Sequence, residues 1–105
     1  MSNFDDYQEF TNRTAIYPST DWREYLMNGL VSEIGELAAL YKREVRDDVP
    51  VPKKEVEKEF GDILWYLTRL VDEEGSSLDV VASGNIAKLQ DRMERNVLQG
   101  SGGDR

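Results

Sequence analysis

Apolar residues recur at helical spacing through almost the whole chain, and this periodicity constrains the fold more than any other feature of the sequence. No stretch shows the alternation of apolar and polar residues that is typical of a half-buried strand. Pro50 and Pro52 interrupt the pattern, because proline cannot continue a helix and biases the residue before it towards extended backbone. The sequence therefore predicts an all-α chain that turns back on itself at these prolines.

The periodicity and the capping residues predict four helices, at about residues 5–13, 21–46, 53–74 and 78–99. Gly75 is the expected C-cap of the third helix, and Ser76 with Asp79 resembles a capping box for the fourth. The second and third helices carry apolar stripes that we expect to face inwards: Leu26, Leu30, Ile34, Leu37, Leu40 and Tyr41, and Val56, Phe60, Ile63, Leu64, Leu67, Leu70 and Val71. We expect an antiparallel helical bundle of about four helices.

The length of 105 residues predicts a single domain over residues 1–105, in which residues 100–105 form a flexible, glycine-rich tail. A domain of this size buries only a modest core. We therefore expect oligomerisation to complete the bundle, in a homodimer or a tetramer.

The formal net charge of −8 argues against binding to a nucleic acid polymer, because contacts to the phosphate backbone need Lys and Arg. The charge is uneven, since residues 1–84 hold 18 acids and 9 bases whereas residues 85–105 hold 3 acids and 4 bases. No apolar run approaches the roughly 18 to 20 residues of a membrane span, and no signal-peptide pattern is present. We expect a cytoplasmic protein that does not enter a membrane.

The chain contains neither cysteine nor histidine. These absences exclude Ser-His and Cys-His nucleophile systems, zinc sites built on thiolate or imidazole, and the Glu-x-x-His pattern of di-iron bundles. A metal site in this chain would use oxygen ligands, which suit Mg²⁺ or Mn²⁺ better than zinc.

Two acid pairs at i,i+3 stand out, Glu33 with Glu36 and Glu59 with Asp62. Spacing alone does not distinguish them, since the chain contains six such pairs, but apolar residues flank these two on the same helical face. Folding back at the prolines can bring both pairs to similar heights. Four carboxylates in a partly dry site are unfavourable unless cations compensate their charge. The pattern therefore favours a divalent metal site over its alternative, an ordinary charged groove without metal.

Gly35 and Gly61 lie inside the two acid pairs, where glycine costs a helix about 1 kcal/mol relative to alanine. Close helix approach or room for a ligand would offset this cost, and so would simple tight packing. The sequence leaves these alternatives open.

The acid pairs occur within the segments Ser-Glu-Ile-Gly-Glu-Leu and Glu-Phe-Gly-Asp-Ile-Leu-Trp-Tyr-Leu. With Tyr7-Gln8-Glu9-Phe10 and Asn85-Ile86-Ala87-Lys88-Leu89, they make the chain resemble the MazG-like, all-α nucleoside triphosphate pyrophosphohydrolases over nearly its whole length. The resemblance implies hydrolysis of a (d)NTP, standard or modified, to the monophosphate and pyrophosphate, for nucleotide-pool control or house-cleaning. It also implies Mg²⁺, for which Mn²⁺ can substitute. The implied metal ligands are Glu33, Glu36, Glu59 and Asp62, with Glu33 or Glu36 as the catalytic base.

Substrate contacts are expected from the basic end of the chain. Lys88, Arg92 and Arg95 share a helical face, and arginine can grip phosphate with two hydrogen bonds. Asn85 lies one turn earlier, and Arg105 belongs to a tail that resembles the family's Gly-Asp-x-Arg ending but departs from it, because Asp104 and Arg105 are adjacent. The alternative for the basic face is a stripe that balances an acidic protein. Four aromatic residues can stack on a base or pack in the core: Trp22, Tyr25, Trp65 and Tyr66.

Two other functions remain open from the sequence. The same acids would serve a pyrophosphohydrolase of another nucleotide, such as phosphoribosyl-ATP or an alarmone. A non-catalytic helical interaction protein with residual acid pairs is the alternative from a different class. Base and sugar preference are not predicted, because they depend on the shape of the pocket.

Overall fold

The computed structural model describes residues 3–95, and all of their regular secondary structure is helical. The helices are α1 (Phe4–Arg13), α2 (Trp22–Asp47), α3 (Lys53–Glu73) and α4 (Leu78–Glu94), so the predicted all-α class and its four helices are confirmed. Helix α4 ends at Glu94, short of the predicted Gln99, and the predicted tail with Arg105 lies outside the described residues. None of the described helices is both long enough and apolar enough to cross a membrane.

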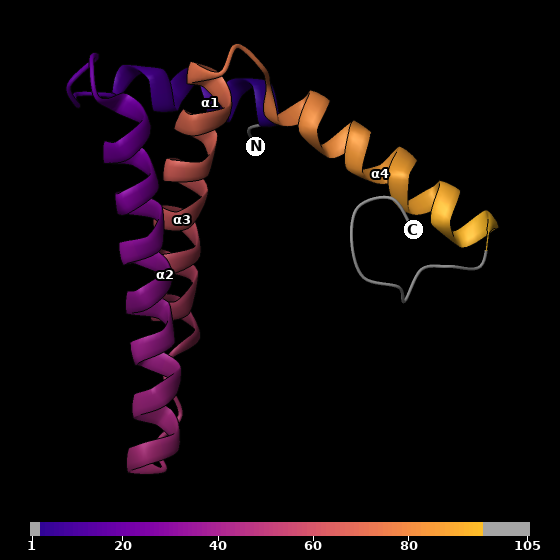
Figure 1. The fold of residues 1–105 in the computed structure, drawn as a ribbon. Helices are drawn as coiled ribbons and strands as arrows, with labels where there is room; N and C mark the ends of the chain where they lie inside the picture. Colours follow the sequence, from indigo (N-terminus) through magenta and orange to yellow (C-terminus); the bar gives the residue numbers. More distant parts are fainter. Residues whose placement is uncertain (1–2, 96–105) are drawn as a thin grey trace.

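Helices α2 and α3 run side by side as a long antiparallel hairpin (Figure 1). Asp48 ends α2 in the left-handed conformation, with φ of 55°, and Pro52 occupies the N-cap position of α3. The Glu44 carboxylate accepts a hydrogen bond of 2.7 Å from the backbone N–H of Val51, which fixes the turn between the helices. The reversal of the chain at the proline segment therefore forms as predicted.

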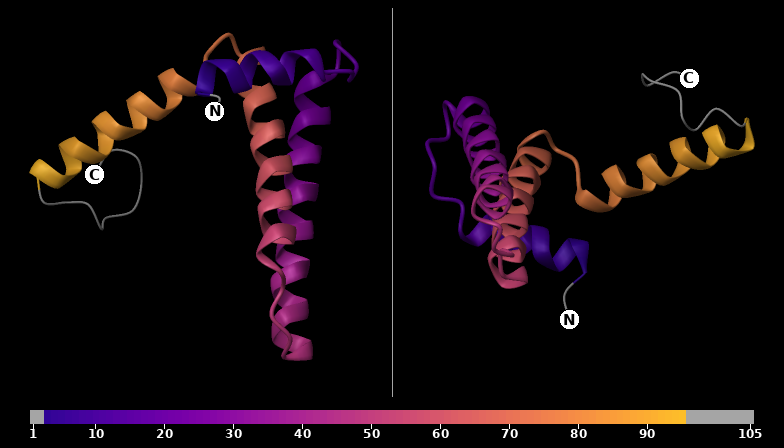
Figure 2. Two further views of the ribbon diagram at one scale, coloured as in Figure 1. Left: turned by 180° about the vertical axis from the view of Figure 1, so that it is seen from behind. Right: turned by 90° about the horizontal axis from the view of Figure 1, so that it is seen from below.

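Helix α1 crosses one end of the hairpin, and α4 extends away from that end (Figure 2). Gly75, with φ of +79°, closes α3: its N–H bonds to Asp72 O at 2.9 Å, and the N–H of Ser76 bonds to Val71 O at 3.0 Å. Because Ser76 belongs to this closing turn, the N-cap of α4 is Ser77, whose Oγ accepts from Val80 N at 3.1 Å. The capping box predicted at Ser76 is therefore one residue too early.

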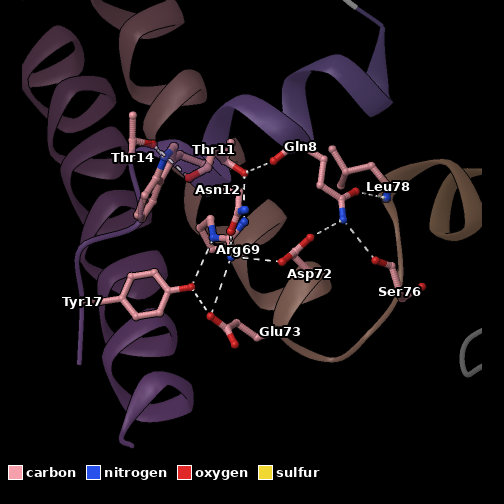
Figure 3. A network of polar contacts seen from close by, with 11 residues as sticks. Gln8, Thr11, Asn12, Thr14, Tyr17, Arg69, Asp72, Glu73, Ser76 and Leu78 are labelled. Atoms are coloured by element: carbon pink, nitrogen blue, oxygen red, sulfur yellow. Dashed lines mark hydrogen bonds and ion pairs between the residues drawn. The ribbon is translucent and has the colours of Figure 1, made fainter. Parts of the chain in front are cut away.

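A polar network ties α1 to α3 (Figure 3). Its centre is Arg69, whose side chain is only 2% exposed. The guanidinium donates to Tyr17 Oη and to Thr11 Oγ1, both at 3.2 Å. It also forms an ion pair with Asp72 at 3.1 Å, so the buried charge is compensated.

Gln8 of α1 extends the same network to the start of α4 (Figure 3). Its Nε2 donates to Asp72 Oδ1 at 2.8 Å and to Ser76 O at 3.1 Å. Its Oε1 accepts from the backbone N–H of Leu78 at 2.9 Å. One side chain therefore fixes the turn from which α4 leaves the hairpin.

Among the described residues, Leu26 and Leu78 are the only buried apolar side chains. Four residues that the periodicity placed on inward stripes are between 41% and 50% exposed: Ile34, Tyr41, Phe60 and Leu67. Since α4 makes its main contacts with α1, it does not cover these side chains. One chain therefore leaves the predicted bundle open along the hairpin.

Candidate metal centre

The α2–α3 hairpin brings acids from both helices to the same height. Glu33 of α2 and Glu59 and Asp62 of α3 each offer a carboxylate oxygen, and these oxygens lie within 4.8 Å of one another. All three residues are half-buried. Three of the four acids predicted as metal ligands therefore converge in a single chain.

Two oxygens of this cluster are buried without a hydrogen-bond partner among residues 3–95. They are Oε2 of Glu33 and Oε2 of Glu59. A buried acceptor without a partner typically costs about 1–3 kcal/mol, and more when it is charged. A cation between the helices would remove this cost, and carboxylate oxygens are the ligands that Mg²⁺ and Mn²⁺ prefer. The residues present therefore fit a hard divalent cation.

The electrostatics of the cluster affect Glu33 most. Burial raises the pKa of Glu33 to about 7, helped by a hydrogen bond to Glu36 and by the charges of Glu36, Asp62 and Glu59. Without a cation, the Glu33 carboxyl therefore binds a proton at mildly acidic pH, where an ordinary glutamate is ionised. Glu36 is exposed and lies outside the set of three converging oxygens.

The predicted phosphate-binding residues of α4 do not lie at the acid cluster of their own chain, because α4 extends away from the hairpin (Figure 1). Asn85 and Lys88 are exposed on α4, whereas Arg92 is buried. Arg95 pairs with Asp91 at 2.9 Å. Within one chain, the structure therefore does not bring the cationic side chains of α4 to the acid cluster.

Trp22 also lies apart from the acids. It begins α2, eleven residues before Glu33, which corresponds to about 16 Å along the helix axis. The guanidinium of Arg23 lies over its ring, 5.0 Å from the ring centroid. Trp65 makes structural contacts, since its Nε1 donates to Thr14 Oγ1 at 2.8 Å. The structure therefore does not place Trp22 at the acid cluster, and it gives Trp65 a structural hydrogen bond to Thr14.

The glycines inside the acid pairs have no close neighbours. A Cβ atom added at Gly35 or at Gly61 would meet nothing within 4 Å, so tight packing within the chain does not explain them. The sequence motifs did not single out Gly29. The ring of Tyr66 packs against it so closely that a Cβ atom at this position would overlap the ring. The sequence feature that could have drawn attention to Gly29 is its position, one helical turn before Glu33.

Comparison with known proteins places this hairpin in a family. Residues 23–97 match the family model described as the MazG nucleotide pyrophosphohydrolase domain. The chain belongs to the MazG nucleotide pyrophosphohydrolase family. The MazG match contains both acid pairs and the whole of α3 and α4, so the resemblance inferred from the motifs is confirmed.

A relative of known sequence matches this MazG-family chain almost end to end. It is the Gene 37 protein of Mycobacterium phage L5, which is 38% identical over 111 residues. The match covers 96% of this chain and 97% of the phage protein. No solved structure matches the chain.

Proposed function

We propose that this MazG-family chain is a Mg²⁺-dependent nucleotide pyrophosphohydrolase that converts a (d)NTP, standard or modified, to the (d)NMP and pyrophosphate. The observation that carries the proposal is the convergence of Glu33, Glu59 and Asp62, two of which hold a buried oxygen without a partner among residues 3–95. Family membership supports chemistry at a nucleotide phosphoanhydride. The oxygen-only ligand set supports Mg²⁺, with Mn²⁺ as a substitute.

Glu33, Glu59 and Asp62 would hold the cation, and Glu36 would join them or act beside them. When bound, the cation would neutralise charge on the triphosphate and make an attacking water more acidic. Through the cation, the three carboxylates would also hold the reacting phosphate at a fixed place beside α2 and α3, because the two helices are packed together.

Glu36 is the best-placed general base. Its carboxyl hydrogen-bonds to Glu33, yet its side chain is exposed and is not one of the three converging ligands. We assign to it the proton of the attacking water: the water oxygen bonds to phosphorus, the phosphoanhydride bond breaks, and pyrophosphate leaves. Glu36 then returns the proton to solvent.

A second copy of the chain is part of the proposal. The accessible surface of the chain is 7869 Å². A compact protein of 12.1 kDa is expected to expose about 6,000 Å², so this chain exposes roughly a third more. The exposed residues include apolar side chains of the hairpin, such as Phe60, and of α4, such as Ile86 and Met93. We propose a homodimer or a tetramer in which these surfaces cover one another.

This assembly would also complete the site. Helix α4 of one copy would reach the acid cluster of another and bring its polar face to the triphosphate. The contributing residues would be Asn85, Lys88, Arg92 and Arg95, with Arg105 beyond the described residues; the exposed Lys88 is the strongest candidate. Charge complementarity at Lys88 supports this placement, because its exposed ammonium group would meet the negative triphosphate.

A pyrophosphate-release screen of the purified wild-type chain tests the proposal. The panel contains NTPs, dNTPs, damaged nucleotides, phosphoribosyl-ATP and alarmones, each with Mg²⁺ and with a chelator. We expect at least one (d)NTP to be hydrolysed with Mg²⁺ and none with the chelator. Turnover confined to phosphoribosyl-ATP or to an alarmone would replace the proposed substrate. No turnover, together with no binding of Mg²⁺ or Mn²⁺ by calorimetry, would leave the non-catalytic interaction protein.

A further inference from the structure

Tyr66 of α3 lies directly on the backbone of α2 at Gly29. A Cβ atom added at Gly29 would lie 2.1 Å from Cε1 and 2.5 Å from Cζ of Tyr66, at which distances the atoms overlap. The other described glycines have nothing within 4 Å of an added Cβ. Gly29 is therefore a notch in α2 that admits the hydroxyl-bearing end of the Tyr66 ring.

This notch lies beside the acid cluster. Side chains on a helix lean towards its N-terminus, so Glu33 leans towards Gly29, four residues earlier in α2. For the same reason Tyr66 leans towards Asp62, four residues earlier in α3. Since the two helices are antiparallel and packed together, both tilts bring the Tyr66 hydroxyl to the end of the cluster nearest Gly29.

The Tyr66 hydroxyl is a neutral donor in acidic surroundings. Burial raises its pKa first, followed by the nearby Tyr25, Glu33 and Asp62. It is therefore protonated at neutral pH, and it forms no hydrogen bond with any other residue in the range 3–95. A lysine at this place would pair with the carboxylates and compete with a cation, whereas a phenol leaves them free to bind one.

The Tyr66 ring is held on two sides. The backbone of α2 occupies one, and the ring of Trp65 meets it edge to face, with centroids 5.1 Å apart and planes at 86°. These two neighbours fix the orientation of the ring, so that it can hold its hydroxyl at one place beside the acid cluster. Its hydroxyl is the group that remains available to a ligand.

We propose that Tyr66 is a further substrate-contacting residue, whose hydroxyl donates a hydrogen bond to a phosphate oxygen of the polyphosphate held at the acid cluster. Gly29 is the positioning residue that seats it there. The inference rests on the proposed function and adds to it a neutral phosphate donor supplied by the same chain as the acids.

Tyr66→Phe tests the hydroxyl while it keeps the ring in its notch, and Tyr41→Phe, an exposed tyrosine on α2, is the matched control. Calorimetry measures binding of Mn²⁺ alone, and then binding of inorganic pyrophosphate to the Mn²⁺-saturated chain. We expect Tyr66→Phe to weaken pyrophosphate binding about tenfold, the effect of one hydrogen bond to a charged group. Mn²⁺ affinity and Tm should stay at wild-type values, and Tyr41→Phe should change nothing.

Three outcomes would overturn the inference, and they are distinguishable. Unchanged pyrophosphate binding in Tyr66→Phe refutes the contact while it leaves the proposed function intact. An equal loss of Mn²⁺ affinity shows that Tyr66 acts on the metal site and not on phosphate. A wild-type chain that binds neither Mn²⁺ nor pyrophosphate refutes the proposed function and this inference together.

Gly29→Ala tests the notch by displacing the ring. We expect it to weaken pyrophosphate binding about as much as Tyr66→Phe does, with a lower Tm because the helices must separate. The double variant should lose no further pyrophosphate affinity, since both changes remove the same contact. Additive losses would contradict the role of Gly29 as the seat of Tyr66.

Discussion

Arg69→Met removes the charge at the centre of the network that joins α1 to α3, while it keeps a side chain of similar length. The guanidinium is buried and serves three groups at 3.1–3.2 Å: Tyr17, Thr11 and Asp72. Methionine cannot donate to any of them. We therefore expect a large loss of stability from a position with no contact to the acid cluster.

The magnitude follows from what each group loses. Removing one partner of a buried ion pair typically costs about 3–5 kcal/mol. The Asp72 side chain is 36% exposed and keeps its hydrogen bond from Gln8, so water and Gln8 replace part of the lost contact. The expected loss is therefore about 3 kcal/mol, which corresponds to a fall in Tm of roughly 12–24 °C for a chain of this size.

Urea unfolding followed by far-UV circular dichroism, at one fixed protein concentration, measures this loss. Arg13→Met is the matched control, because Arg13 pairs with Glu9 at 3.7 Å while both side chains are at least 70% exposed. Exposed pairs contribute about 0–1 kcal/mol, so the control should unfold close to wild type. If Arg69→Met and Arg13→Met have the same free energy of unfolding, Arg69 does not hold α1 on α3.

Three further predictions concern the site and the assembly. The folded-state pKa of Glu33, about 7, lies above the ordinary value of 4.5, so the stability that its protonated carboxyl contributes is present below about pH 4.5 and is lost as the pH rises through 7. Because Mg²⁺ binds the ionised carboxylate, Mg²⁺ should raise Tm more at pH 8 than at pH 5. Equal shifts of Tm at the two pH values in thermal scans would contradict this. Phe60→Glu should convert the oligomer to monomer in light scattering with its helicity retained, whereas an unchanged mass would place the interface elsewhere. When inactive Lys88→Ala and Asp62→Asn chains are mixed, some sites combine the intact Lys88 of one copy with the intact Asp62 of the other. The mixture should then regain up to about a quarter of wild-type activity if the site is shared between two copies, and none if each site belongs to one chain.

The helices and their pairing could be predicted because their causes are local in the sequence. The period of the apolar residues gave α1 to α3 to within one or two residues, and Pro50 and Pro52 marked the reversal between α2 and α3. The meeting of Glu33 with Glu59 and Asp62 followed from the lengths of the two helices on either side of that turn. Register in an antiparallel helical pair can therefore be read from residue counts.

The direction of α4 could not be predicted, because contacts distant in sequence decide it. Gln8 bonds to the backbone of Ser76 and Leu78, nearly seventy residues later. The segment Tyr7-Gln8-Glu9-Phe10 contributed to the family resemblance, but it gave no sign that Gln8 would bond to the turn before α4. The role of Arg69 could not be predicted either, because its sequence neighbours gave no sign that α1 would supply hydrogen-bond partners for it.

The notch at Gly29 escaped prediction for a related reason. Gly35 and Gly61 drew attention because they lie inside the motifs, yet a Cβ atom at either would meet nothing within 4 Å. A glycine's role depends on what approaches it from another helix, and the approaching group, Tyr66, lies 37 residues away in sequence. Motif membership alone does not identify such contacts.

The central claim is that the carboxylates of α2 and α3 drive release of pyrophosphate with Mg²⁺. The most direct measurement compares kcat/KM for pyrophosphate release in Asp62→Asn with that in Glu24→Gln, whose acid lies in another i,i+3 pair of the chain. We expect Asp62→Asn to lose at least about a hundredfold, the effect of removing a metal ligand or its orientation, while Glu24→Gln keeps wild-type activity and both keep their helicity. Equal activity in the two variants would contradict the account.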